Sequence, residues 1–534
     1  MALDLLIRDA TVVDGAGGPS FRGSVAVADG RIAWVRRTGG AEESPAAGPA
    51  HPSEADEPAA ITTIDAAGRV LAPGFIDVHT HSDLAPFTDP WMDSTLRQGV
   101  TTVVVGNCGM SAWPVTGLDG IAAFLGTTRE ALPPWTSFDE YLAAIEAARP
   151  ACNVAALVGF GSLRTQVMAH ERRQATPAEV VEMRRLLGEA MEAGTLGMSS
   201  GLIYVPDVYA TTDEVAAVAA AAAPFGGLYT THMRAEGRLI FDAVREAVVI
   251  GRRAGVHAHV SHLKLDGRRA WGRADELLAL VDEAGASADQ YPYTAWETDL
   301  ASFLPAWAPV NELDELLADA PTRDRLVRSI EEGEPGWESS VADSGWERIV
   351  LEARDPALAD HDIAHVAAGR GEPPVDTALA LLREDPGIAV RGHAMDEGDV
   401  RALLARPDIL IASDGMAVAP EGPLYGTPLH PRSYGTFPRV LGRYVREADV
   451  LTLETAVRKM TSLPAETFGL AGRGLLSEGS WADLVLFDPE VVADTADFGD
   501  AHRYPVGIDV VVVNGRVAWD GGRRARAGRA VRRG

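Results

Sequence analysis

The chain has 534 residues, of which 46% are hydrophobic and 23% are charged, and its formal net charge is −28. Its length exceeds one ordinary hydrophobic core and predicts a large domain with a smaller one, while its acidic balance argues against nucleic-acid binding, which normally needs a basic surface. Two cysteines make no disulfide framework, and neither a membrane-spanning apolar stretch nor a signal peptide is recognisable, so we expect a cytoplasmic protein without a membrane partner.

Both ends of the chain predict β-structure. Residues 1–72 contain short apolar runs separated by turn signals such as Asp14-Gly15 and Asp29-Gly30. Within them, residues 41–60 are rich in Ala, Pro, Glu and Ser, which is typical of a disordered loop. Residues 465–534 repeat the β pattern, and neither end alone is long enough for a closed sheet. We therefore predict that the two ends form one β-sandwich-like domain.

Residues 73–464 alternate between strand-like and helix-like segments, which predicts a parallel sheet, closed or open. Thr176–Glu179 and Thr211–Glu214 both have the pattern of a capping box at a helix N-terminus. Nine candidate strands are available for the eight positions of a barrel, and Ile388–His393 is the surplus one. Residues of about 305–385 are acidic and helix-like, so we interpret them as an insertion.

Residue types that bind metals or transfer protons end five of the apolar runs. These runs end in Asp77-Val78-His79-Thr80-His81, Gly106-Asn107-Cys108-Gly109, Thr230-Thr231-His232, Val260-Ser261-His262 and Ile411-Ala412-Ser413-Asp414. Because the carboxyl ends of parallel barrel strands meet at one face, these residues are expected to converge. Taken singly, Cys108 could be a packed small side chain and Asp414 a turn residue. Together, thiolate, imidazole and carboxylate groups favour a zinc site.

Strand parity narrows the set of histidines. Side chains alternate across a strand, so His79 and His81 share one face and could hold one ion together. His257 and His259 have the opposite parity to His262, so they are expected to face the surrounding helices.

The segments around these residues resemble the amidohydrolase superfamily, and within it the D-aminoacylases (N-acyl-D-amino-acid deacylases). The resemblance covers almost the whole chain and is carried by Gly74–Asp83, Gly106–Ser111, Ser199–Tyr204, Thr231–Gly237, Ser261–Lys264, Tyr291–Tyr293, Ser413–Gly415 and His430–Gly442. It implies a (β/α)8 metal-dependent hydrolase barrel with a β-domain built from both termini. It also implies zinc-dependent hydrolysis of a small-molecule substrate, an N-acyl-D-amino acid or a related carboxylated amide, to a carboxylate and a free D-amino acid.

The same resemblance implies two metal positions of unequal affinity. A tightly held zinc would use Cys108, His232 and His262. A weaker second metal would use His79 and His81, with the Cys108 thiolate able to bridge the two ions.

The resemblance further implies which residues handle the substrate. Asp414 would take a proton from the attacking water and pass it to the leaving amine. Lys264, Tyr291 and Arg432 would hold the α-carboxylate of the substrate, for which a pair of cations is chemically suited.

Several positions depart from the family pattern and are expected to shape the substrate pocket. Glu297 and Thr298 lie where one small hydroxyl residue is usual, and a glutamate there would repel an α-carboxylate unless it faces away or Thr298 replaces it. Trp113, Phe160 and His393 also differ from the usual residue types. The change at Trp296-Glu297 leaves open a cyclic-amide hydrolase or a D-peptidase on the same metal frame. A third alternative is a catalytically silent barrel, against which the intact ligand candidates and Asp414 argue. The sequence does not indicate an oligomeric state.

Overall fold

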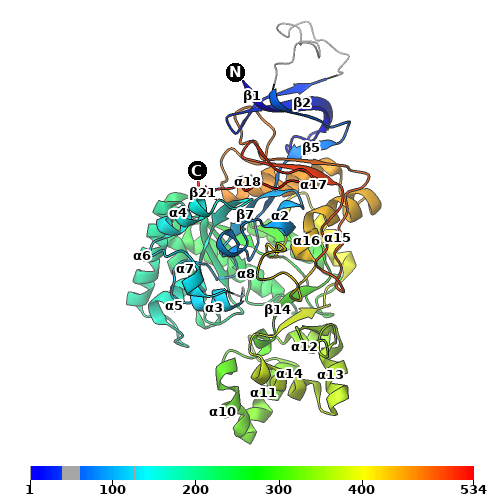
Figure 1. Ribbon diagram of the computed structural model, residues 1–534. Helices are drawn as coiled ribbons and strands as arrows, with labels where there is room; N and C mark the ends of the chain where they lie inside the picture. The colour runs from blue at the N-terminus through cyan, green and yellow to red at the C-terminus, as the bar shows by residue number, and fades with distance from the viewer. Residues whose placement is uncertain (1, 39–59, 125–126) are drawn as a thin grey trace.

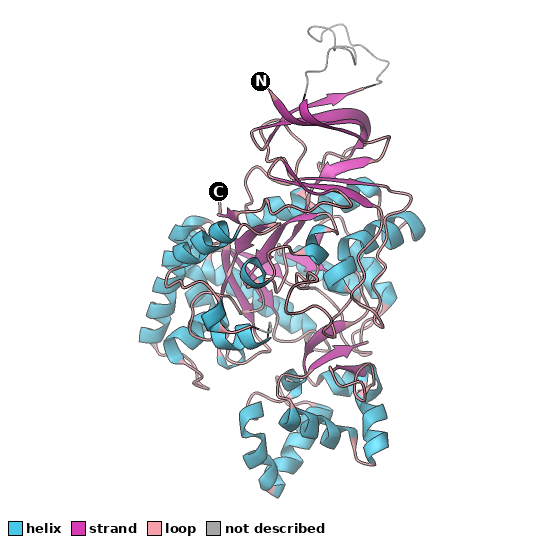
Figure 2. Cartoon of the chain, in the orientation of Figure 1, coloured by secondary structure: helices cyan, strands magenta, loops and turns pink. Residues whose placement is uncertain are grey.

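The computed structural model describes residues 2–38, 60–124 and 127–534 (Figure 1). A β-domain, a central barrel and a helical segment follow one another down the long axis of the view, and Figure 2 shows helices surrounding the strands of the middle part. Apart from Ala60, the loop predicted over residues 41–60 lies outside the described residues. Within the described ranges, no helix is long and apolar enough to cross a bilayer.

The central part is a parallel barrel whose strands are neighbours in chain order. They are β6 (Phe75–Asp77), β7 (Val100–Val105), β8 (Asn153–Ala156) with its continuation β9 (Val158–Gly159), β10 (Gly197–Gly201), β11 (Leu228–His232), β12 (His257–Val260), β13 (Ser287–Gln290) and β17 (Ile409–Ile411). The ring closes where Thr80 bridges Gly415 and the backbone N–H of Asp414 donates to the carbonyl of His79. The last strand therefore lies beside the first.

Helices cover the outside of the barrel. They are α1 (Ala85–Thr88), α2 (Asp93–Leu96), α3 (Leu118–Phe124), α4 (Phe138–Ala148), α5 (Phe160–Met168), α6 (Pro177–Ala193), α7 (Thr212–Ala219), α8 (Ile240–Ala254), α9 (Ala274–Ala284), α15 (Glu397–Ala405), α16 (Arg432–Arg439), α17 (Leu453–Met460) and α18 (Ser462–Phe468). The capping box that begins α6 is confirmed, because the Thr176 hydroxyl accepts from the Glu179 N–H and the Glu179 carboxylate accepts in return.

The second predicted capping box is only half correct. The Thr211 side chain does cap α7, but Glu214 does not reach back to it. Instead the Glu214 carboxylate pairs with the buried guanidinium of Arg164 and accepts from the N–H of Ala175. The competing partner is distant in sequence, so local spacing could not predict it.

The β-domain is one eight-stranded mixed sheet to which both ends of the chain contribute. Its strands are β1 (Leu3–Val12), β2 (Phe21–Ala28), β3 (Arg31–Arg37), β4 (Ala60–Asp65), β5 (Val70–Pro73), β18 (Leu484–Phe487), β19 (Ile508–Val513) and β20 (Arg516–Trp519). The antiparallel pair β5–β18 joins the two contributions, and side chains from both share one core. As predicted, Asp29-Gly30 turns the chain between β2 and β3, with φ values of 51° and 75° that suit a tight hairpin.

An insertion follows β13 and has its own sheet and core. The sheet order is β14 (Trp296–Asp299), β16 (Ala389–Gly392), β15 (Ile349–Glu352), all antiparallel, and its helices are α10 (Leu313–Ala318), α11 (Ala320–Glu332), α12 (Ser340–Ser344), α13 (Ile363–Arg370) and α14 (Pro374–Glu384). The surplus strand of the sequence is thus β16, outside the barrel. The separate core runs from Tyr291 to Met395, which is wider than the predicted 305–385.

Candidate metal centre and active site

Three residues at strand ends have an unusual backbone conformation. Cys108, His262 and Asp414 have φ values of 51°, 36° and 53°, in the left-handed region that residues other than glycine rarely adopt. Such conformations persist only where the surrounding structure imposes them, and they cluster at functional sites. Here they follow β7, β12 and β17 and point three reactive side chains across one mouth of the barrel.

The loop that carries Cys108 depends on its flanking glycines. Gly106 and Gly109 have φ values of 80° and 78°. A Cβ on Gly106 would lie 2.2 Å from the Leu157 carbonyl oxygen, and one on Gly109 would lie 2.3 Å from Asp207 Oδ2. Both contacts are too close for real atoms, so the position of the Cys108 sulfur depends on the absence of two side chains.

Cys108, His232 and His262 form one compact group of donor atoms. The Cys108 Sγ lies 3.9 Å from His232 Nδ1 and 3.7 Å from His262 Nε2, and all three residues are buried. A tetrahedral zinc with bonds of about 2.0–2.3 Å separates its ligand atoms by roughly 3.3–3.8 Å. The distance to His262 lies within this range and the distance to His232 exceeds it by about 0.1 Å, so the chemistry and the approximate spacing of this group suit zinc.

A second group shares the same sulfur. His79, His81, Cys108 and Asp414 each offer a ligand atom within 4.8 Å of the others. The Cys108 Sγ lies 3.3 Å from His79 Nε2, and Asp414 Oδ1 lies 3.1 Å from His81 Nε2 and 3.3 Å from His79 Nε2. Because Cys108 belongs to both groups, its sulfur could bridge two adjacent ions.

The surroundings of two acidic side chains, the Cys108 thiol and the Asp414 carboxyl, favour their charged forms. Burial alone would raise the pKa of the Cys108 thiol, but the adjacent imidazoles of His79, His232 and His262 outweigh it and hold the pKa well below its usual range. Burial would likewise raise the pKa of Asp414, yet the Arg432 guanidinium and the neighbouring histidines lower it well below its usual value. The thiolate is the form that binds metals, and the carboxylate is the form that accepts a proton.

The Glu236 carboxylate lies beside the imidazole of His262. Its Oε1 lies 3.0 Å from His262 Nδ1 and 2.5 Å from the ammonium of Lys264, and that ammonium also lies 3.0 Å from His262 Nδ1. If His262 is to offer its Nε2 lone pair to a metal, Nδ1 must carry a hydrogen, and of these two neighbours only Glu236 can accept it. Carboxylate partners of this kind orient metal-binding histidines and increase their basicity.

We expect Glu236→Gln to weaken zinc binding about 10- to 100-fold, the range usual for loss of such a partner. The amide can keep the packing but no longer supplies a full negative charge to His262. Competition with a chelator would measure the zinc dissociation constant, with the exposed Glu276→Gln on α9 as the control. An unchanged constant in Glu236→Gln would contradict this role.

Two cations flank one aromatic ring next to these groups. The Lys264 ammonium lies 5.8 Å and the Arg432 guanidinium 5.2 Å from the centre of the Tyr291 ring. The Tyr291 hydroxyl is buried and has no hydrogen-bond partner within the described part of the chain. Lys264 and Arg432 together form a cationic corner. Arg432 Nη1 donates to Asp414 Oδ2 at 2.8 Å, and this hydrogen bond connects the cationic corner to the metal-donor groups.

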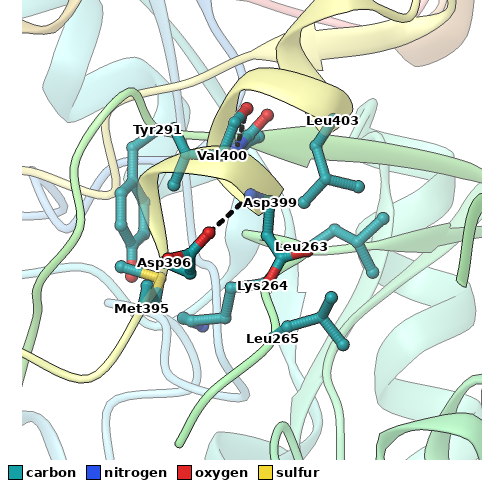
Figure 3. A pocket seen from close by; sticks show the side chains of 10 residues that line it. Leu263, Lys264, Leu265, Tyr291, Met395, Asp396, Asp399, Val400 and Leu403 are labelled. Atoms are coloured by element: carbon teal, nitrogen blue, oxygen red, sulfur yellow. Dashed lines mark hydrogen bonds between the residues drawn. The ribbon is translucent and has the colours of Figure 1, made fainter. Parts of the chain in front are cut away.

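Figure 3 shows Lys264 and Tyr291 at the edge of a small cavity whose other walls include the aliphatic Leu263, Leu265, Val400 and Leu403. The cavity has about 10 Å³ open to the centre of a water molecule. Such a space holds about one water molecule and no amino-acid side chain. This cavity is therefore too small to be a substrate pocket.

The residues predicted to shape the pocket lie in different places. The Thr298 hydroxyl is 3.2 Å from that of Tyr204, and Glu297 Oε2 is 3.5 Å from Arg432 Nη2. His393 accepts from Arg391 Nε, and burial lowers its pKa to about 4. Trp113 and Phe160 are buried in the main hydrophobic core instead, so they act on the pocket only through packing.

Glu236 and Asp289 are supporting carboxylates that were not predicted, and a third, Asp77, was named only as part of a strand-end run without a role. Glu236 lies within a segment that carries the family resemblance, but its spacing of four residues after His232 was the only further signal. Asp289 lies in the buried strand β13. Its carboxylate accepts a hydrogen bond from the backbone N–H of His262 and forms another with the imidazole of His259. Asp77 accepts from the N–H of Ser413, and burial raises its pKa to about 7. A charged residue inside an otherwise apolar strand is the pattern that could have identified the last two.

Known proteins match this chain over nearly its whole length. It is 37% identical over 520 residues to a D-aminoacylase of Alcaligenes xylosoxydans xylosoxydans (97% of this chain, 94% of the relative) and 37% identical over 518 residues to an N-acyl-D-glutamate deacylase of the same organism (96% and 93%). The solved N-acyl-D-glutamate deacylase from Bordetella bronchiseptica, complexed with zinc and a phosphonate inhibitor, superposes with a TM-score of 0.81 at 34% identity and complete coverage of both chains. The profile of the amidohydrolase family matches residues 62–518, and the chain belongs to this family.

Proposed function

We propose that this protein is a zinc-dependent deacylase that hydrolyses the amide bond of N-acyl-D-amino acids. The observation that carries the proposal is the position of Asp414, between the imidazoles of His79 and His81 on one side and the guanidinium of Arg432 on the other. A proton-accepting carboxylate thus lies between a metal-binding donor set and a cationic corner suited to an anionic substrate. The relatives that act on N-acyl-D-amino acids share the fold and about a third of the sequence.

The two donor groups are the proposed zinc ligands. Cys108, His232 and His262 would hold the tightly bound ion, and His79 and His81 would hold a weaker one that shares the Cys108 sulfur. Zinc supplies Lewis acidity, which polarises a carbonyl and lowers the pKa of water.

Asp414 is the proposed proton carrier. Its Oδ1 faces His79 and His81, and its Oδ2 is held by Arg432, so one oxygen is fixed while the other faces the donor groups. Asp414 would accept a proton from the attacking water and return it to the amine nitrogen as the carbon–nitrogen bond breaks. A positioned acid–base group of this kind contributes about 10²- to 10⁴-fold to rate.

The proposed binding site for the α-carboxylate of the substrate consists of Lys264, Tyr291 and Arg432. A guanidinium and an ammonium close to the same phenol can bind a carboxylate through charge-assisted hydrogen bonds. The buried hydroxyl of Tyr291, which has no hydrogen-bond partner among the described residues, gives this site an unused donor. A fixed carboxylate places the amide at a set distance from Asp414, and this fixed geometry provides selectivity for one enantiomer.

The proposed function is tested by incubating the zinc-loaded protein with paired N-acyl-D- and N-acyl-L-amino acids and analysing the chirality of the amino acids released. We expect release of free D-amino acids only. Release from the L-series alone, or from neither series with zinc verified in the protein, would overturn the proposal.

A cyclic-amide hydrolase or D-peptidase is the second candidate, because Glu297 lies beside the cation that an α-carboxylate would use. Adding hydantoins and D-dipeptides to the same panel separates it from the first. A catalytically silent barrel is disfavoured by the complete donor set and by Asp414. We also propose that the protein works in the cytoplasm, since both cysteines are free thiols that fit a reducing compartment.

A further inference from the structure

We propose that Glu297 selects against substrates with a second carboxylate, so that the enzyme prefers N-acyl-D-amino acids with neutral side chains to those derived from D-glutamate. This inference rests on the proposed function and narrows its substrate class. Similarity to relatives cannot supply it, because the chain is equally identical, at 37%, to a general D-aminoacylase and to an N-acyl-D-glutamate deacylase.

The first argument is the position of Glu297 on the insertion. It lies on β14 directly opposite Arg391 of β16, on the face of the small sheet that meets the barrel mouth. Its Oε2 lies 3.5 Å from Arg432 Nη2, while Arg432 Nη1 donates to Asp414 Oδ2 at 2.8 Å. The guanidinium therefore lies between two carboxylates. A substrate bound to Arg432 must lie beside Glu297, whose side chain is only 10% exposed.

The second argument is that the neighbouring cations are already engaged. Arg391 donates from Nη1 to Glu352 Oε1 at 2.9 Å, from Nη2 to Asp360 Oδ1 at 3.2 Å and from Nε to His393. Its guanidinium thus has no free edge for a substrate carboxylate. Lys264 is held at 2.5 Å by Glu236. An α-carboxylate can compete for Arg432 and Lys264. A second anion would have to displace Glu352 or Asp360 from Arg391, or reach Arg348, which donates to the backbone carbonyl of His393.

The third argument is the crowding of carboxylates at this end of the pocket. Burial, and after it the adjacent Glu297 carboxylate, raise the pKa of Glu352 well above its usual range. Glu352 Oε1 is already paired with Arg391 Nη1 at 2.9 Å, and its Oε2 is buried and has no hydrogen-bond partner among the described residues. Glu297 thus disfavours a negative charge on its neighbour, and a second substrate carboxylate placed beside it would meet the same cost.

The experiment compares N-acetyl-D-glutamine with N-acetyl-D-glutamate, which have the same size and differ by one charge. Because a like charge placed nearby in a protected site is strongly unfavourable, we expect wild-type kcat/KM to favour the glutamine substrate by about 100-fold or more. Glu297→Gln should reduce this preference at least about 10-fold by removing the repulsion. Glu297→Ser is a second, smaller replacement, and Glu315→Gln, an exposed glutamate of α10 in the same insertion, is the matched control.

A binding measurement makes the result independent of turnover. The dissociation constants of the same two ligands, measured by calorimetry in zinc-loaded Asp414→Asn with and without Glu297→Gln, should show the same change in preference. Equal binding of both ligands, or a preference that Glu297→Gln leaves intact, would overturn the inference while leaving the deacylase proposal standing. Absence of all D-deacylase activity in the wild type would overturn the proposed function, and the ratio of dissociation constants would still decide the role of Glu297. If neither ligand bound any variant, both proposals would fall.

Discussion

Asp414→Asn is expected to lower kcat for an N-acyl-D-amino acid by about 10²- to 10⁴-fold, which is the usual contribution of a positioned acid–base group. The asparagine side chain has nearly the same shape and can still accept from Arg432 Nη1, so the pocket keeps its form. It cannot take up a proton from water and return it to the amine. The donor group of Cys108, His232 and His262, which is the proposed tight zinc site, does not include position 414, so zinc bound there should remain.

Steady-state kinetics together with zinc analysis of the same preparation would test this expectation. Asp449→Asn is a closely matched control, because Asp449 also has a left-handed φ, of 50°, but is exposed on the surface. The chemical change and the backbone conformation are then the same, and only the location differs. Turnover near the wild-type level in Asp414→Asn would remove Asp414 as the proton carrier.

Cys108→Ala is expected to have the second large effect, on metal content. The sulfur of Cys108 belongs to both donor groups, with His79 Nε2 at 3.3 Å and His262 Nε2 at 3.7 Å. Loss of a partner outside the ligand set already weakens metal binding 10- to 100-fold, so loss of a shared ligand should weaken it by at least about 100-fold. Activity should fall with the zinc.

Zinc per chain after dialysis against a weak chelator is the measurement, and Cys152→Ala is the control. Cys152 is also a buried free thiol, but it donates to the carbonyl of Val100 far from the donor groups. Cys152→Ala should therefore keep its zinc. A fully loaded Cys108→Ala protein would show that the histidines alone hold the ion.

The sequence predicts those features that depend on local pattern. The alternation of strands and helices leads to the parallel barrel, and Thr176 with Glu179 marks the start of α6 correctly. Parity is wrong for His259, which was expected to face the helices. Its neighbours Ala258 and Val260 pack on the helices instead, and the ring of His259 packs on Phe468 within the cluster that fills the barrel interior. Parity does not show that the same imidazole bonds Asp289, because that partner comes from the next strand.

The features that escape prediction depend on contacts between distant segments. The Glu214 carboxylate does not complete the expected capping box because it pairs with the buried guanidinium of Arg164. Glu236 contacts both His262 and Lys264 only because β11 and β12 are paired. Glu297 is a clear departure in the sequence, but its meaning depends on the insertion folding back against Arg432. Spacing along the chain contains no information about these approaches.

The pairing of β5 with β18 has a consequence for the order of events during synthesis. β1, β2 and β5 leave the ribosome first, yet β5 has an open edge until β18 is made near the other end of the chain. Contacts between such distant segments form slowly, and an unpaired edge is prone to wrong association. β6, which leads to His79 and His81, follows β5 after a single glycine. The first strand of the barrel can pair with β7 early, but its attachment to the β-domain is complete only when the nascent chain is almost finished.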